Sequence, residues 1–170
     1  MMKLLEFNNN WKHFFNSEKE LLSKALANQE ISNIEHIGAT SVVMCATAGT
    51  IDLLLSIPNS IDFVTIKNIL VRKGYKFIED KSDYFNLMYF VRKNTKGGIV
   101  ATLRLVEHSS KTHREILAFK YWLQENRIHV NKYNEFRRTL IEKCGNDIKK
   151  YQDTKKGYIE SVLNDFCVIK

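Results

Sequence analysis

Two features of the sequence could support chemistry on a phosphorylated ligand. Asp52 lies inside an almost continuous apolar run, residues 50–57, where a buried carboxylate needs a cation, a metal ion or strong hydrogen bonds. A turn of small residues, Gly38, Ala39, Thr40 and Ser41, follows a short apolar stretch. The backbone amides and hydroxyl groups of such a turn can hold a phosphate group.

Each feature also has a purely structural explanation, since Asp52 follows Gly49 and could cap a turn at the exposed end of a strand. Together they have the order strand, small-residue turn, carboxylate-bearing strand. That order suits a site for a nucleoside triphosphate and a divalent metal ion such as Mg²⁺. Position 54 is leucine, however, and alternate residues of a strand share a face. No second carboxylate is therefore expected two residues along, on the face of Asp52.

Three basic residues could neutralise phosphate charge. Arg92 and Arg104 belong to two neighbouring predicted strands, and Lys155 lies four residues after Tyr151 on the apolar stripe of a predicted helix. A lysine on that stripe points toward the core or a cleft, or it extends its amine to water. The histidines lack metal-ligand spacing, and His36 is expected to pack beside the sheet.

Hydrophobic periodicity indicates the elements that position these residues. Strands are predicted at residues 34–38, 50–57, 75–79, 84–92 and 99–107, the third of them at a sheet edge and the last two joined as a hairpin through residues 94–98. Helices are predicted at residues 11–26, at residues 63–73 after a cap at 58–60, and three times after residue 110, with His129 between two of these. The order predicts an α/β (α+β) fold, in which one domain over residues 1–170 has a mixed sheet flanked by helices and a helical C-terminal region. Neither a dinucleotide-binding glycine motif nor a P-loop occurs.

The composition favours a soluble protein with anionic partners. The chain has 170 residues, 44% of them hydrophobic, and its 26 Lys and Arg against 19 Asp and Glu give a net charge of +7. Nucleotides, phosphorylated small molecules and nucleic acid all fit that charge, although nucleic acid has no support beyond it. No apolar run approaches the roughly 18 residues of a membrane span, and the N-terminus lacks a signal-peptide pattern. With three scattered cysteines, we expect a cytoplasmic location and no membrane partner.

Longer motifs resemble the GrpB-like family of nucleotidyltransferase-fold proteins. Residues 34–42, Ile-Glu-His-Ile-Gly-Ala-Thr-Ser-Val, followed by Ile51 and Asp52, are similar to the family signature Glu-His-Ile-Gly-Ser-Thr-Ser-Val-Pro-Gly-Leu-Ala-Ala-Lys-Pro-Ile-Ile-Asp-Ile. Residues 7–15, 90–93 and 151–159 resemble the opening, hairpin-strand and closing motifs of the family in the same order. The resemblance implies a nucleotidyltransferase-like sheet and a cleft for a nucleotide.

Departures from the family motifs leave two hypotheses open. Ala39 replaces the turn serine, and Thr102 and Arg104 replace the two histidines of a later strand. In the first hypothesis, Asp52 is catalytic and binds Mg²⁺, while the 38–41 turn, Arg92, Arg104 and Lys155 hold the phosphates during transfer of a nucleotidyl group to an acceptor. In the second, the chain is a catalytically inactive binding or regulatory domain that recognises a nucleotide or another phosphorylated ligand.

Overall fold

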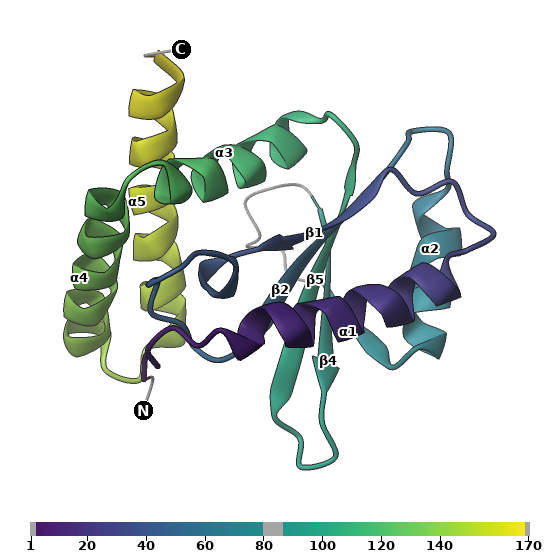
Figure 1. Ribbon diagram of the computed structural model, residues 1–170, viewed down its shortest axis with the longest axis horizontal. Helices are drawn as coiled ribbons and strands as arrows, with labels where there is room; N and C mark the ends of the chain where they lie inside the picture. Colours follow the sequence, from purple (N-terminus) through teal and green to yellow (C-terminus); the bar gives the residue numbers. More distant parts are fainter. Residues whose placement is uncertain (1–2, 80–86, 169–170) are drawn as a thin grey trace.

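The computed structural model describes residues 3–79 and 87–168, and its centre is a mixed five-stranded sheet (Figure 1). The strands are β1 (Asn33–Ile37), β2 (Ile51–Ile57), β3 (Tyr75–Ile78), β4 (Met88–Lys93) and β5 (Ile99–Glu107), in the order β1-β2-β5-β4-β3. Only β2 and β5 pair in parallel, whereas the other three pairs are antiparallel. The predicted edge position of residues 75–79 and the predicted hairpin through residues 94–98 are both confirmed.

One face of the sheet packs against α1 (Asn10–Ala25) and α2 (Phe63–Arg72). Alternate residues of the central strands supply this core, including Leu53 and Leu55 of β2 and Leu103 of β5, all of them without exposed surface. Because side chains of a strand alternate between faces, the residues between them face the opposite side. Leu54 and Val106 of that second face pack against Ile116 of α3 (Lys111–Glu125).

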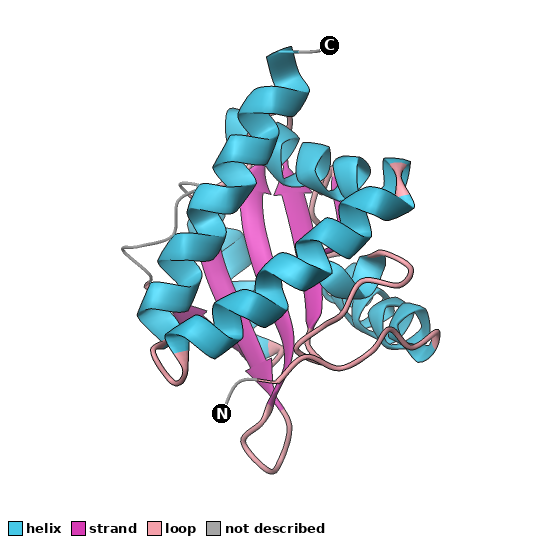
Figure 2. Cartoon of the chain, turned by 90° about the vertical axis from the view of Figure 1, so that its left-hand side faces the viewer, coloured by secondary structure: helices cyan, strands magenta, loops and turns pink. Residues whose placement is uncertain are grey.

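The C-terminal helices form a group on the second face of the sheet, where α3 packs against it (Figure 2). In Figure 1, α3, α4 (Arg127–Cys144) and α5 (Ile148–Val168) lie together on the left, and in Figure 2 helices cross in front of the strands. A short 3₁₀ helix, η1 (Ala39–Ser41), connects this group to the sheet, since Ala39 and Val42 pack with Leu123, Val130 and Tyr133. The predicted helical C-terminal region is confirmed.

Several local expectations need correction. The cap of α2 is Asp62, whose carboxylate accepts hydrogen bonds from the amides of Val64 and Thr65, so residues 58–60 do not cap that helix. His129 lies in the first turn of α4, because Asn126 caps the helix three residues earlier. Residues 84–86 of the predicted fourth strand lie outside the described residues. Among the helices of the described ranges, none is long and apolar enough to cross a membrane.

Candidate functional site

The surroundings of Asp52 are set by the pairing of three strands. Asp52 is the second residue of β2, opposite Ile37 of β1 and Thr102 of β5. Residues opposite each other in paired strands point to the same face, and Thr102 Oγ1 donates a hydrogen bond of 2.5 Å to Asp52 Oδ1. The carboxylate is half-buried and faces the side of the sheet that carries α3. One of its two oxygens is therefore satisfied by the protein itself.

The 38–41 turn touches the second oxygen of this carboxylate. Because β1 ends opposite Asp52, the chain leaves the sheet directly beside it, with Gly38 at φ +69°. A Cβ atom on Gly38 would lie 2.3 Å from Asp52 Oδ2, far inside van der Waals contact. Glycine is required here both by the positive φ and by this close approach. The structure thus brings together the two features with which the sequence argument began.

The hydroxyl groups of the turn form internal hydrogen bonds. Thr40 is buried, and its Oγ1 lies 2.9 Å from His36 Nε2, while Ser41 Oγ donates to the Gly38 carbonyl at 2.7 Å. Ala39 packs against the apolar cluster beneath the C-terminal helices. Both hydroxyl groups of the turn are therefore already bonded within the protein.

His36 supports the turn from the other face of the sheet. Its ring stacks on Phe15 of α1, with ring centres 4.5 Å apart and planes 4° from parallel, which confirms the expected packing beside the sheet. Burial is the main cause that lowers the pKa of His36 from 6.5 to about 4, and the positive charge of Lys120 lowers it further. His36 is therefore neutral at physiological pH, with one ring nitrogen bonded to Thr40.

Arg104 shares the face of Asp52. Arg104 lies opposite Leu54 of β2, two residues after the Asp52–Thr102 pair along the strands. Two residues of a strand span about 7 Å. The residue is half-buried, and its Nε atom has no hydrogen-bond partner although it is shielded from solvent. A buried donor without an acceptor is costly, so an acceptor supplied by a ligand would be stabilising here.

Arg92 lies on the opposite face. It is paired with Ala101 of β5, whose side chain belongs to the core beneath α1 and α2. There the guanidinium forms an ion pair with Glu18 of α1, and its Nε donates to Glu18 Oε2 at 3.0 Å. The hydroxyl of Tyr75 donates to the same oxygen at 2.8 Å. Arg92 and Arg104 are on neighbouring strands, as expected, but the sheet separates their side chains.

Lys155 belongs to the C-terminal helices. It lies half-buried on α5, with Nζ 5.8 Å from the centre of the Tyr151 ring one turn earlier. The hydroxyl of Tyr151 accepts a hydrogen bond from Arg137 Nε at 3.2 Å. Lys155 therefore lies on the side of its helix that carries the buried Tyr151.

The donor set around Asp52 does not fit a two-metal site. Asp52 supplies one carboxylate, and its Oδ1 already accepts the Thr102 hydroxyl. Leu54, the next residue on the same face, is 1% exposed and apolar, and Arg104 beside it carries a positive charge. Within residues 3–79 and 87–168, no cluster of three or more His, Cys, Asp or Glu could hold a metal ion. Glu35 of β1 lies opposite Leu54 on the same face, but it forms an ion pair with Lys120 of α3 at 3.7 Å. Two-metal transfer needs several free carboxylate oxygens, and both carboxylates here already have partners in the protein.

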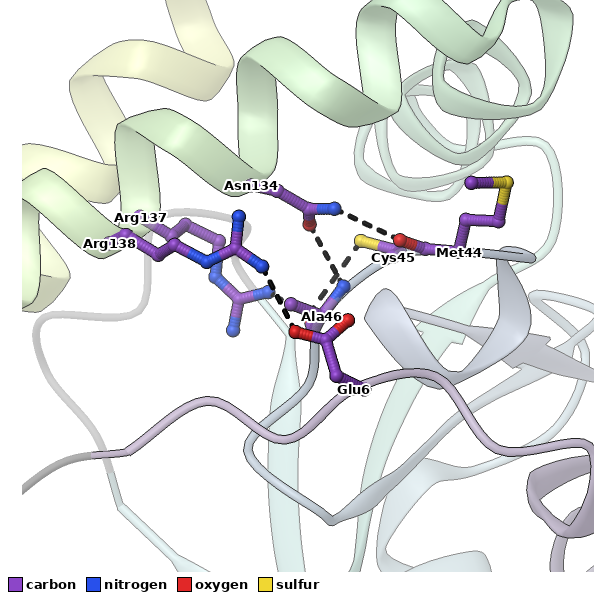
Figure 3. Close-up of polar contacts among 7 residues, drawn as sticks. All are labelled: Glu6, Met44, Cys45, Ala46, Asn134, Arg137 and Arg138. Carbon is purple, nitrogen blue, oxygen red and sulfur yellow. Dashed lines mark hydrogen bonds and ion pairs between the residues drawn. The ribbon is translucent and has the colours of Figure 1, made fainter.

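A group of buried polar residues on α4 was not expected from the sequence. Asn134 and Arg137 are each 6% exposed and reach the segment that precedes β2 (Figure 3). Burial raises the pKa of the neighbouring Tyr133 phenol, and the charge of Asp52 is among the smaller causes that raise it, so α4 lies within electrostatic reach of the site. The sequence does carry a sign of these buried residues, since Asn134 and Arg137 lie on the same helical stripe as the apolar residues of α4, Val130, Tyr133 and Leu140.

A surface depression of about 340 Å³ also runs along α4. It is lined by Asn131, Asn134, Glu135, Arg138, Thr139 and Glu142. None of these is a predicted site residue, and the lining mixes acidic with basic side chains. We therefore centre the candidate site on Asp52 and the 38–41 turn.

The fold and this arrangement define a protein with a nucleotidyltransferase-like fold. Among solved structures, the chain is similar to GrpB from Enterococcus faecalis, with a TM-score of 0.81, 21% identity and 96% of each chain covered. It is also similar to the Cid1 poly(U) polymerase with Mg 3'-dATP bound, with a TM-score of 0.54 and 11% identity, over 91% of this chain and 49% of that one. At these identities the similarity shows the fold.

The family follows from the sequence comparison. Residues 1–165 match the model of the family described as GrpB protein. A relative from Alkalihalophilus pseudofirmus, named Glutamate-rich protein GrpB, is 25% identical over 95% of this chain and 94% of its own length. The chain belongs to the GrpB family, which confirms the resemblance seen in its motifs.

Proposed function

We propose that this chain binds a nucleotide, or a similar phosphorylated ligand, on the face of the sheet that carries Asp52, and that this binding is independent of a metal ion. In this arrangement Arg104 receives the phosphate, and the 38–41 turn borders the ligand beside Asp52. Asp52 accepts a hydrogen bond from a ligand hydroxyl or amino group. This proposal corresponds to the second hypothesis from the sequence, a binding domain without catalysis, on a fold that is shared with nucleotidyltransferases.

The observation that carries the proposal is the unsatisfied Nε atom of Arg104 on the face of the sheet that also carries the Asp52 carboxylate. Arg104 Nε is shielded from solvent and has no hydrogen-bond partner, although it lies a single pleat from Thr102. A phosphate oxygen would supply the missing acceptor in a charge-assisted hydrogen bond. The net charge of +7 adds long-range attraction for the same ligands.

Asp52 supports the proposal because a single carboxylate suits a neutral donor better than a phosphate. Its Oδ1 is occupied by Thr102, while its Oδ2 lies beside Gly38, an exposed residue. A ribose hydroxyl or a base amino group can donate to such an oxygen, whereas a phosphate beside it would be repelled. The two groups therefore favour a ligand with a phosphate at one end and a hydrogen-bond donor at the other.

Isothermal titration calorimetry with ATP, in EDTA and again in Mg²⁺, tests the proposal. We expect binding in EDTA, and a loss of roughly 10- to 100-fold in affinity for Arg104→Gln, the range of a charge-assisted hydrogen bond. Arg72→Gln, at the exposed end of α2, is the matched control for the loss of one positive charge. It is expected to bind almost as the wild type does.

Three outcomes would overturn the proposal. Equal affinity in Arg104→Gln and the wild type would remove the phosphate site. Binding that requires Mg²⁺ and disappears in Asp52→Ala would instead support the first hypothesis, in which this face transfers a nucleotidyl group with metal assistance. Binding to single-stranded RNA that falls steeply with salt and ignores Asp52 would indicate the nucleic-acid alternative.

A further inference from the structure

The segment between the 38–41 turn and β2 is held by side chains of α4. Asn134 Nδ2 donates to the Met44 carbonyl at 2.9 Å, and Asn134 Oδ1 accepts from the Ala46 amide at 2.8 Å (Figure 3). One amide side chain thus satisfies a backbone acceptor and a backbone donor two residues apart. The Arg137 guanidinium, one helical turn further on, donates to the Ala46 carbonyl. Both side chains are buried, so these bonds are protected from competition by water.

A continuous series of backbone hydrogen bonds joins this segment to the turn. The amide of Cys45 donates to the Val42 carbonyl, the amide of Val42 to Ala39, and that of Ser41 to Gly38, at 3.1, 3.3 and 3.2 Å. On the other side, Thr47 pairs with Leu5 through two backbone bonds of 2.7 and 2.8 Å. A displacement of Ala46 would therefore be transmitted to Gly38, which touches Asp52.

Met44 shows that the segment needs an external restraint. Its φ is +65°, in the left-handed region that non-glycine residues adopt at a cost of about 1 to 2 kcal/mol. The side chain is 41% exposed and adds little packing, so nothing in Met44 itself favours this conformation. The Val42–Cys45 backbone bond closes a turn around Met44, and the Asn134 bond to the Met44 carbonyl fixes that turn to α4. Strain of this kind persists only where the surroundings impose it.

We propose that Asn134, with Arg137 beside it, is a positioning residue that sets the 38–41 turn against Asp52. The C-terminal helices are then part of the binding apparatus, although neither residue touches the candidate site. The inference rests on the proposed function for its effect on affinity. Its effect on the turn can be measured without a ligand.

Hydrogen–deuterium exchange on the whole chain tests the ligand-independent part. The variants are Asn134→Leu, which removes both bonds at similar volume, and Asn134→Asp, which keeps an acceptor for Ala46 and loses the donor to Met44. Asn131→Leu, one turn earlier and exposed, is the matched control on the same helix. We expect the exchange rates of the Ser41, Val42 and Cys45 amides to rise about tenfold in Asn134→Leu. The free energy lost with one buried hydrogen bond corresponds to about a tenfold change in the local opening equilibrium. A smaller rise is expected in Asn134→Asp, and none in Asn131→Leu.

Affinity for ATP separates positioning from general stability. Met44→Gly in the Asn134→Leu background removes the strain and is expected to restore the denaturation midpoint. If Asn134 positions the turn, affinity stays about tenfold low in this double variant, while a purely stabilising role predicts that affinity returns with stability. A rise in exchange confined to residues 44–47, or recovery of affinity in the double variant, would overturn the inference. If the wild type binds no ATP, the proposed function fails, and the exchange result alone decides the role of Asn134.

Discussion

The ion pair between Glu18 and Arg92 joins α1 to β4 and provides a sharp test of which arginine belongs to the site. Its side chains are 10% and 28% exposed, so both charges are largely removed from water. Glu18 Oε2 also accepts the hydroxyl of Tyr75, a residue that is 1% exposed. Glu18→Leu would leave a guanidinium without its partner and a buried phenol without its acceptor.

The expected magnitudes follow from this geometry. Breaking a fully buried pair costs about 3 to 5 kcal/mol, and the partial exposure of Arg92 lowers the figure to about 2 to 4 kcal/mol for Glu18→Leu. Arg92→Met leaves the less exposed carboxylate alone, although Tyr75 still donates to it, and we expect about 2 to 3 kcal/mol. The double variant replaces the pair with apolar groups and is expected to recover at least half of the summed loss, because no unpaired charge remains.

Urea unfolding, followed by tryptophan fluorescence and circular dichroism, measures these changes as shifts in the free energy of unfolding. The ligand arm of the experiment uses Arg92→Met at a temperature where it is folded. ATP affinity is expected to be unchanged, because the guanidinium lies on the α1 face of the sheet. Two results would refute the reasoning: single variants within about 0.5 kcal/mol of the wild type, the usual range of surface changes, or a loss of ATP affinity in Arg92→Met that matches Arg104→Gln.

The remaining predictions concern the turn and its neighbours. Gly38→Ala is expected to destabilise the fold by about 2 to 4 kcal/mol, since its Cβ would meet Asp52 at 2.3 Å. Gly74→Ala, which is also at positive φ but in open space, should cost only about 1 to 2 kcal/mol. Thermal or urea unfolding measures both changes. Met44→Gly in the wild-type background is expected to raise stability by about 0.5 to 1 kcal/mol, the relief of left-handed strain less the entropy of glycine. Because the pKa of His36 is lowered to about 4, the unfolded chain binds a proton near pH 6.5 and the folded chain only near pH 4. The free energy of unfolding is therefore highest above pH 6.5 and should fall by about 1 to 2 kcal/mol as the pH drops to 4. Urea midpoints across this range should show a smaller fall in His36→Gln, and an equal fall would contradict the assignment.

The regular elements were predictable because their patterns are local. Residues 50–57 read as a strand buried on both faces, and β2 is buried on both sides apart from Asp52. The turn at Gly38 and the hairpin loop near Gly97 follow from small residues whose positive φ the structure shows. The contact between the turn and Asp52 also required β1 to pair with β2 in the register that sets Ile37 opposite Asp52.

The partners of the charged residues were not predictable in the same way. Strand alternation assigns residues to two faces, but the choice of face for Arg92 depends on its register with Ala101 and on which helices cover that side. Its partner Glu18 lies 74 residues away on α1. Similarly, Asn134 is 88 residues from the Ala46 amide that it accepts. Contacts at such separations depend on how helices pack on the sheet, which no local pattern encodes.

The sequence by itself determined that a small-residue turn would precede a strand carrying Asp52, and that Leu54 would leave this carboxylate without a second one two residues along. Those conclusions need only the period of a β-strand and the conformational freedom of glycine. Tertiary structure alone decided that Arg104 shares the face of Asp52, while Arg92 pairs with Glu18 on the other face. It also decided that α4 holds the segment leading to β2. The physical reason is that burial and charge pairing depend on three-dimensional neighbours, which are fixed only when the sheet and helices pack together.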